Sequence, residues 1–148
     1  MSKVSRVSRV SKVSKVSKVS KVNRKESEAM ENKEFAKELE KRTRKFAVNI
    51  INLSSMLPGT LEGRVVRTQI TKSGTSVGAN YREANRARSK TDFKNKIAIS
   101  ESESSETGYW LEIIEDMKWI EPTILQPIYN ESNELLAIFT SIGKSLNE

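Results

Sequence analysis

The chain of 148 residues has room for one domain with a hydrophobic core, and it contains neither cysteine nor histidine. These absences exclude disulfides, metal sites made of thiolates or imidazoles, and the commonest general base. The sequence also has no signal-peptide core and no run of about 18 apolar residues, so we expect a cytoplasmic protein without a membrane partner. The net charge of +7 is unevenly divided, because residues 1–25 carry nine basic side chains and no acid, whereas residues 26–148 carry 17 basic and 19 acidic side chains.

A basic repeat opens the chain. From Ser2 to Val22 the unit Ser-Lys/Arg-Val occurs seven times. A period of three spreads the valines over every face of a helix and over both sides of a strand, so no core can collect them. We therefore predict a disordered basic tail and polar linker over residues 1–32. The tail is either an electrostatic contact to RNA or DNA phosphates or a translated tandem repeat without a selected role.

Two amphipathic helices are predicted next, over residues 33–57 and about 62–88, separated by a Pro-Gly pair that ends the first. One face of the first helix collects Phe35, Leu39, Phe46, Ile50, Leu53 and Leu57. The second helix contains Gly74 and Gly78, although each glycine costs about 1 kcal/mol relative to alanine inside a helix. We therefore expect a neighbouring backbone to approach closely at these glycines.

A third helix is predicted to begin at a Ser89 or Thr91 cap and to extend to about Met117. It has two stripes, of which one is rich in apolar and hydroxyl side chains. The second stripe consists of Ile99, Glu103, Glu106, Trp110, Ile113 and Met117. We expect one stripe to face the bundle and the other to face a partner.

A fourth helix is predicted to follow Pro122, which suits a first helical turn, and to continue to the C-terminus. Pro127 requires either that the regular helix begins near residue 126 or that its first turn is kinked. Four long helices with short connections predict an all-α fold, an antiparallel up-down-up-down left-handed four-helix bundle over residues 33–148.

Charge divides this bundle into a basic first half and an acidic second half. One arc of the second helix, roughly opposite its apolar stripe, carries Arg64, Arg67, Lys72, Arg82, Arg86 and Lys90. A continuous basic stripe of this kind can follow nucleic-acid phosphates. Alternatively, it pairs with acidic helices of a neighbouring subunit, because a ring needs two complementary patches on each protomer.

Acidic and aromatic side chains of the third helix, Glu103, Glu106 and Trp110, together with Glu83 of the second, predict a subunit interface. Buried carboxylates need partners, which Arg82 or Arg86 can supply. The enzymatic alternative is a carboxylate metal cluster as in di-iron bundles, but those sites require histidine, and only a carboxylate magnesium site is left. We therefore predict no catalytic residue, no metal and no cofactor.

Three segments resemble a known family: Ser73-Gly-Thr-Ser-Val-Gly-Ala-Asn-Tyr-Arg-Glu-Ala84, Arg86-Ala-Arg-Ser-Lys-Thr-Asp-Phe93 and Tyr109-Trp-Leu-Glu112. This pattern is similar to that of the bacterial 23S ribosomal RNA intervening-sequence proteins, which are four-helix bundles. The resemblance implies a homo-oligomeric ring, a pentamer, and it names no catalytic residue to carry over. It also implies a relation to the accessory protein of diversity-generating retroelements, which partners a reverse transcriptase and binds nucleic acid.

The function expected from these features is that of a non-enzymatic homopentameric scaffold that binds RNA or DNA weakly and without sequence preference. The alternative is a protein-interaction module without a nucleic-acid role, whose charged faces serve ring assembly and a protein client.

Overall fold

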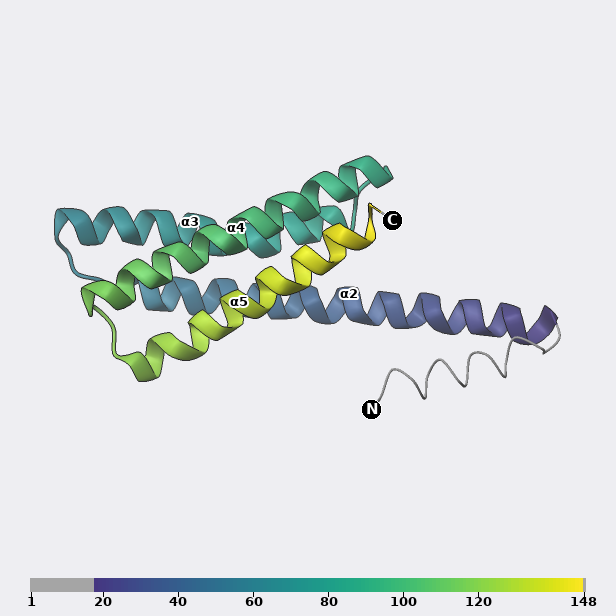
Figure 1. Ribbon diagram of the computed structural model, residues 1–148, viewed down its shortest axis with the longest axis horizontal. Helices are drawn as coiled ribbons and strands as arrows, with labels where there is room; N and C mark the ends of the chain where they lie inside the picture. Colours follow the sequence, from purple (N-terminus) through teal and green to yellow (C-terminus); the bar gives the residue numbers. More distant parts are fainter. Residues whose placement is uncertain (1–17, 148) are drawn as a thin grey trace. The chain divides into compact units, whose positions relative to one another are not determined.

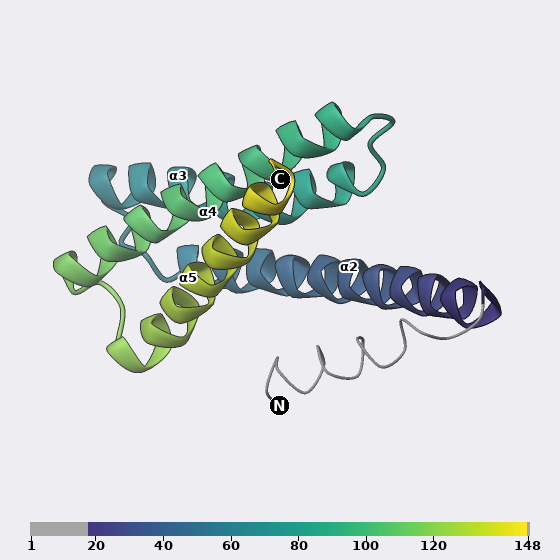
Figure 2. The same cartoon turned by 45° about the vertical axis from the view of Figure 1, so that its right-hand side comes forward.

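Four helices make up the described part of the chain, residues 18–147 of this computed structural model (Figure 1). They are α2 (Lys18–Ser54), α3 (Leu61–Ala84), α4 (Lys90–Met117) and α5 (Pro122–Ser145), and the compact unit that they form is Leu39–Glu148. Consecutive helices of this unit run in opposite directions, and α4 lies between α3 and α5 in both ribbon views (Figures 1 and 2). The predicted all-α up-down four-helix bundle is confirmed, whereas its left-handed twist stays a prediction.

The first helix begins much earlier than its apolar pattern predicts. α2 starts at Lys18 instead of residue 33, so the extended tail and linker predicted for this stretch are wrong from Lys18 onward. The stretch is rich in lysine and glutamate, which are strong helix formers, and Arg24 and Glu28 form an ion pair at 3.4 Å one turn apart. The rest of the predicted tail, residues 1–17, lies outside the described residues, and the division of the chain at residue 32 stays a prediction.

Side-chain caps fix where two of the helices begin. The hydroxyl of Thr60 accepts a hydrogen bond from the Gly63 backbone N–H at 3.1 Å at the start of α3. The hydroxyl of Ser89 accepts one from the Asp92 N–H at 3.0 Å, so Ser89 and not Thr91 caps α4. α5 is already helical from Pro122 and contains Pro127, so the regular helix does not wait until residue 126.

The neighbouring helix α2 approaches both glycines of α3 closely, with backbone contact as expected at Gly78 but with the Ile50 side chain at Gly74. A Cβ atom at Gly74 would lie 2.7 Å from Ile50 Cγ2, and one at Gly78 would lie 2.9 Å from Thr43 Oγ1. Ile50 and Thr43 are both fully buried on α2. Most of the predicted apolar face of α2 is buried too, but Phe35, its first member, is 52% exposed.

Short hydroxyl side chains fill the contacts among α3, α4 and α5. The hydroxyl of Thr107 on α4 donates to the hydroxyl of Ser73 on α3 at 2.9 Å. The hydroxyl of Ser100 on α4 donates to the carbonyl of Val77 on α3, also at 2.9 Å. Within residues 18–147 no buried side-chain nitrogen or oxygen lacks a hydrogen-bond partner. These polar side chains therefore occupy the core without the free-energy cost of unsatisfied groups.

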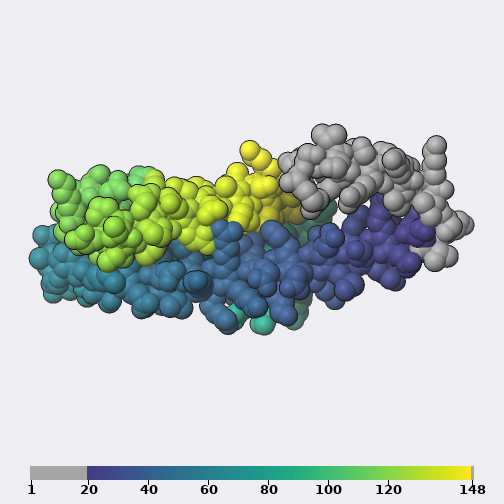
Figure 3. All heavy atoms as spheres, turned by 90° about the horizontal axis from the view of Figure 1, so that it is seen from below, coloured from purple at the N-terminus to yellow at the C-terminus, as the bar shows by residue number. Residues whose placement is uncertain are grey.

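A two-pronged ion pair connects α2 to α5, which lie against each other in the space-filling view (Figure 3). The Arg42 guanidinium donates from Nε to Glu131 Oε2 at 2.7 Å and from its terminal nitrogen to Glu131 Oε1 at 2.6 Å. Glu134 adds a second contact at 3.3 Å. None of the helices in the described part of the chain has an apolar stretch that could cross a bilayer.

Candidate nucleic-acid interface

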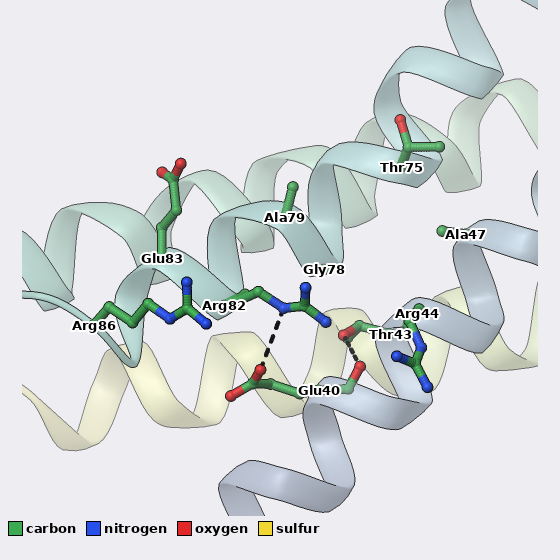
Figure 4. Close-up of a pocket in the computed structure, with 10 residues that line it drawn as sticks. All are labelled: Glu40, Thr43, Arg44, Ala47, Thr75, Gly78, Ala79, Arg82, Glu83 and Arg86. Carbon is green, nitrogen blue, oxygen red and sulfur yellow. Dashed lines mark hydrogen bonds and ion pairs between the residues drawn. The ribbon is translucent and has the colours of Figure 1, made fainter.

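A groove of ≈ 410 Å³ lies between α2 and α3 on the surface of the bundle (Figure 4). Small residues leave this space open, because Ala47 on α2 and Gly78 and Ala79 on α3 all line it, and at Gly78 the α3 backbone lies close to Thr43 of α2. The remaining lining residues are Glu40, Thr43, Arg44, Thr75, Arg82, Glu83 and Arg86.

Three arginines give the groove positive charge: Arg44 on α2, Arg82 on α3 and Arg86 in the turn after α3. Arg82 Nε lies 3.4 Å from Glu40 Oε1, and the Asn85 side-chain amide donates to Glu40 Oε2 at 3.0 Å. Arg44 and Arg86 have no ion-pair partner among the residues that the structure describes. Glu83 lies at the rim and points away from Glu40 (Figure 4), and it pairs with Lys96 of α4 at 2.9 Å. Two guanidinium groups in the groove are therefore available to an anion.

Two arginines of the predicted basic stripe serve the structure instead. The Arg67 guanidinium donates to the carbonyl oxygens of Ser54 and Leu57 at 3.0 and 2.6 Å, at the C-terminal end of α2. Arg64 donates to the Gly59 carbonyl at 3.1 Å. A cation at these carbonyls also offsets the negative end of the helix dipole. The stripe is therefore not one continuous surface for phosphates.

The last two members of the predicted stripe lie beyond α3, because the helix ends at Ala84 and not near residue 88. Arg86 belongs to the turn after α3, and Lys90 is the first residue of α4. Lys72 is exposed, and its charge acts on Glu103 of α4. The basic side chains gather instead at the turn between α3 and α4, which exposes Arg86, Arg88, Lys90 and Lys94.

The predicted interface residues of α4 lie together but without the predicted arginine partners. Burial, and then the negative charge of Glu106, raises the pKa of the Glu103 carboxyl, while Lys72 opposes this shift. The Trp110 indole donates to Glu106 Oε2 at 3.3 Å. Within the chain Arg82 pairs with Glu40 on α2, and the pairing of Glu103 or Glu106 with Arg82 or Arg86 across a subunit interface stays a prediction.

The same α4 face exposes apolar side chains. Ile99 is 40% exposed and Met117 is 50% exposed, with Trp110 and Ile113 partly buried between them. As regards metals, residues 18–147 contain no group of three or more acidic side chains placed to hold an ion.

The sequence profile of the 23S rRNA-intervening sequence proteins matches residues 36–141. The chain belongs to this family. It is also similar to the crystal structure of a protein with unknown function from the S23 ribosomal protein family of Bacteroides thetaiotaomicron, with 40% sequence identity and a TM-score of 0.66. That similarity covers 71% of this chain and 97% of the other. No curated protein matches the chain, and neither similarity names an enzymatic activity.

In this 23S rRNA-intervening sequence protein, Arg44 is the groove residue that sequence reasoning missed. It is one of several cations opposite the apolar face of α2, and nothing in the spacing of these cations distinguishes Arg44 from Lys45. The distinction comes from packing, because Thr43 meets Gly78 and so turns this side of α2, with the neighbouring Arg44, toward α3. The small residues of α2 and α3 do predict that another helix comes close to each of them. They do not predict which helix that is.

Proposed function

We propose that this protein is a non-enzymatic homo-oligomeric scaffold that binds RNA or DNA weakly and without sequence preference. The observation that carries the proposal is the groove between α2 and α3, which is lined by Arg44 of α2, Arg82 of α3 and Arg86 of the turn after α3. The exposed cations of the α3–α4 turn extend this surface. Guanidinium groups donate two hydrogen bonds at once to a phosphate, which supports a nucleic-acid ligand.

The absence of sequence preference follows from what lines the groove. The lining residues include no aromatic ring on which a base could stack and no asparagine or glutamine that could read a base edge. Contacts to phosphates carry no sequence information, and a few of them give weak affinity. A homo-oligomer, for which the family resemblance supports a pentamer, would repeat the surface and raise the total affinity by avidity.

Binding of a generic labelled RNA, measured by fluorescence anisotropy, tests the proposal. We expect Arg82→Glu combined with Arg86→Glu to lower the affinity by about tenfold or more, because attraction to phosphates becomes repulsion. The control is Lys45→Glu combined with Lys144→Glu, which changes the net charge equally at exposed positions outside the groove. Equal losses in both variants, or no binding by the unaltered protein, would contradict the proposal.

A second candidate function is a protein-interaction module without nucleic acid, favoured by the exposed apolar face of α4. Ile99, Trp110 and Met117 share this face with Glu103 and Glu106. Surfaces that combine aromatic and aliphatic side chains with a polar surround are typical of protein contacts. Under this alternative the charged faces serve assembly and a protein client.

Light scattering separates the two candidates. Under the alternative, reversing Arg82 and Arg86 breaks the oligomer while the folded chain persists, and RNA is not bound at any stage. Ile99→Glu with Met117→Glu should also break it, whereas Val65→Glu, at an equally exposed apolar position on α3, should not. If the oligomer persists both in the variant with Arg82 and Arg86 reversed and in Ile99→Glu with Met117→Glu, the groove and the apolar face of α4 do not serve assembly.

A further inference from the structure

We infer that the groove between α2 and α3 receives the sugar–phosphate backbone of a single strand, RNA or DNA, in preference to a duplex. This inference rests on the proposed function and adds the class of nucleic acid to it. The argument depends on the shape of the groove, on the position of its arginines and on the carboxylate of Glu40.

The shape of the groove favours a flexible chain. The groove is bounded by a helix on each side and has Gly78 and Ala79 in its wall, so its charged groups lie in a depression and not on a convex surface. A single strand can bend into such a depression and turn its bases outward, as in other positively charged grooves that follow a strand. A duplex is stiff over about 150 base pairs, and its phosphates lie on its own convex surface. It could touch the arginine tips at the rim but could not follow the groove.

The arginines are placed along the groove so that more than one phosphate can be bound. Arg82 is on the last turn of α3 and Arg86 follows in the turn after this helix, so the two can meet different phosphates of an extended strand. Arg44 lies on the opposite wall (Figure 4). A strand between the walls would therefore be contacted from both sides, which a surface stripe on one helix cannot do.

Glu40 limits how tightly this groove holds an anion. Its carboxylate accepts from Arg82 and Asn85 and so occupies the place beside Arg82 that a phosphate oxygen would take. A bound phosphate must share Arg82 with Glu40 or displace it. A groove of this kind suits weak, reversible binding of a chain of phosphates better than tight binding of one isolated anion.

The test compares a labelled oligouridylate without terminal phosphates with the adenine–uracil duplex of the same length, at equal ionic strength and with the full-length protein. We expect the single strand to bind about tenfold more tightly. Equal or tighter binding of the duplex would overturn the inference and leave the proposed function standing. Failure to bind either form would overturn both.

Two pairs of variants locate the effect in the groove. Arg44→Glu should lower single-strand affinity by about tenfold, whereas Lys45→Glu, the next residue on α2 and outside the groove, should lower it about twofold or less. Ala79→Gln fills part of the groove without changing charge and should weaken single-strand binding, whereas Ala98→Gln at an exposed position on α4 should not.

The remaining outcomes decide against the groove or its ligand. If Arg44→Glu and Lys45→Glu have equal effects, and Ala79→Gln has none, the strand binds elsewhere and the inference is wrong. Poly-glutamate of matched charge and length is the competitor for an acidic protein segment. If it displaces the labelled strand as well as unlabelled oligouridylate does, the groove recognises an acidic peptide and the inference is likewise wrong.

Discussion

At Gly74 the backbone of α3 passes so close to Ile50 of α2 that a single added carbon has no space. The nearest atom, Ile50 Cγ2, would lie 2.7 Å from a new Cβ. We predict that Gly74→Ala lowers the free energy of unfolding by about 1–2 kcal/mol, since overpacking exceeds the gain in helix propensity. Gly108→Ala is the control: its Cβ would meet only Ser132 Oγ at 3.7 Å, so stability should rise by about 0.5–1 kcal/mol. Urea unfolding at one fixed protein concentration measures both, and a stabilised Gly74→Ala would contradict the packing.

The carboxyl of Glu103 should make stability depend on pH. Its pKa is raised in the folded chain by burial and by Glu106, so the folded state binds the proton more tightly than the unfolded state. Stability therefore falls as the pH rises from the unfolded pKa of about 4.3 through the raised folded pKa, and the penalty persists at neutral pH. We predict that Glu103→Gln raises the melting temperature at pH 7 and that this gain disappears below about pH 4. A gain of the same size at both pH values would show that the charge is not its cause.

The end of α2 depends on a side chain from α3. Arg67 donates to the carbonyl of Ser54, which also accepts from the Leu57 N–H, and to the carbonyl of Leu57 just beyond the helix. We predict that Arg67→Met lowers the free energy of unfolding by about 1–2 kcal/mol and leaves RNA affinity within about twofold. Arg82→Met should show the reverse pattern. Chemical unfolding gives the free energy of unfolding, and fluorescence anisotropy on the same samples gives the RNA affinity. A large loss of RNA affinity in Arg67→Met would show that Arg67 belongs to the binding surface.

The apolar pattern of the sequence predicts some helix bounds and misses others, for a physical reason. The periodic burial of apolar residues marked α3 to within a few residues at each end and placed the end of α4 at Met117, because those helices bury one face. It missed the helical stretch from Lys18 to residue 32, in which the side chains of residues 21–32 are exposed, because a helix held by propensity has no such pattern. It also treated all cations of the second helix as one stripe. Whether an arginine contacts a carbonyl, a carboxylate or solvent depends on which helix packs beside it. The sequence of a single helix does not specify that neighbour.

For the whole bundle of this 23S rRNA-intervening sequence family member, the charged and the apolar surface side chains lie on different helices. The arginines of the groove and the cations of the α3–α4 turn lie near one end of α3, whereas the apolar face with Glu103 and Glu106 belongs to α4. The two surfaces can therefore serve different partners, one a chain of phosphates and the other a protein surface.

The most direct test of the nucleic-acid proposal is the salt dependence of single-strand binding. Three arginine–phosphate contacts predict a slope of about −2 for the logarithm of the association constant against the logarithm of the salt concentration. Arg82→Glu with Arg86→Glu should bring that slope to between about −1 and zero. A slope near zero for the unaltered protein, or an unchanged slope in the variant, would contradict the account.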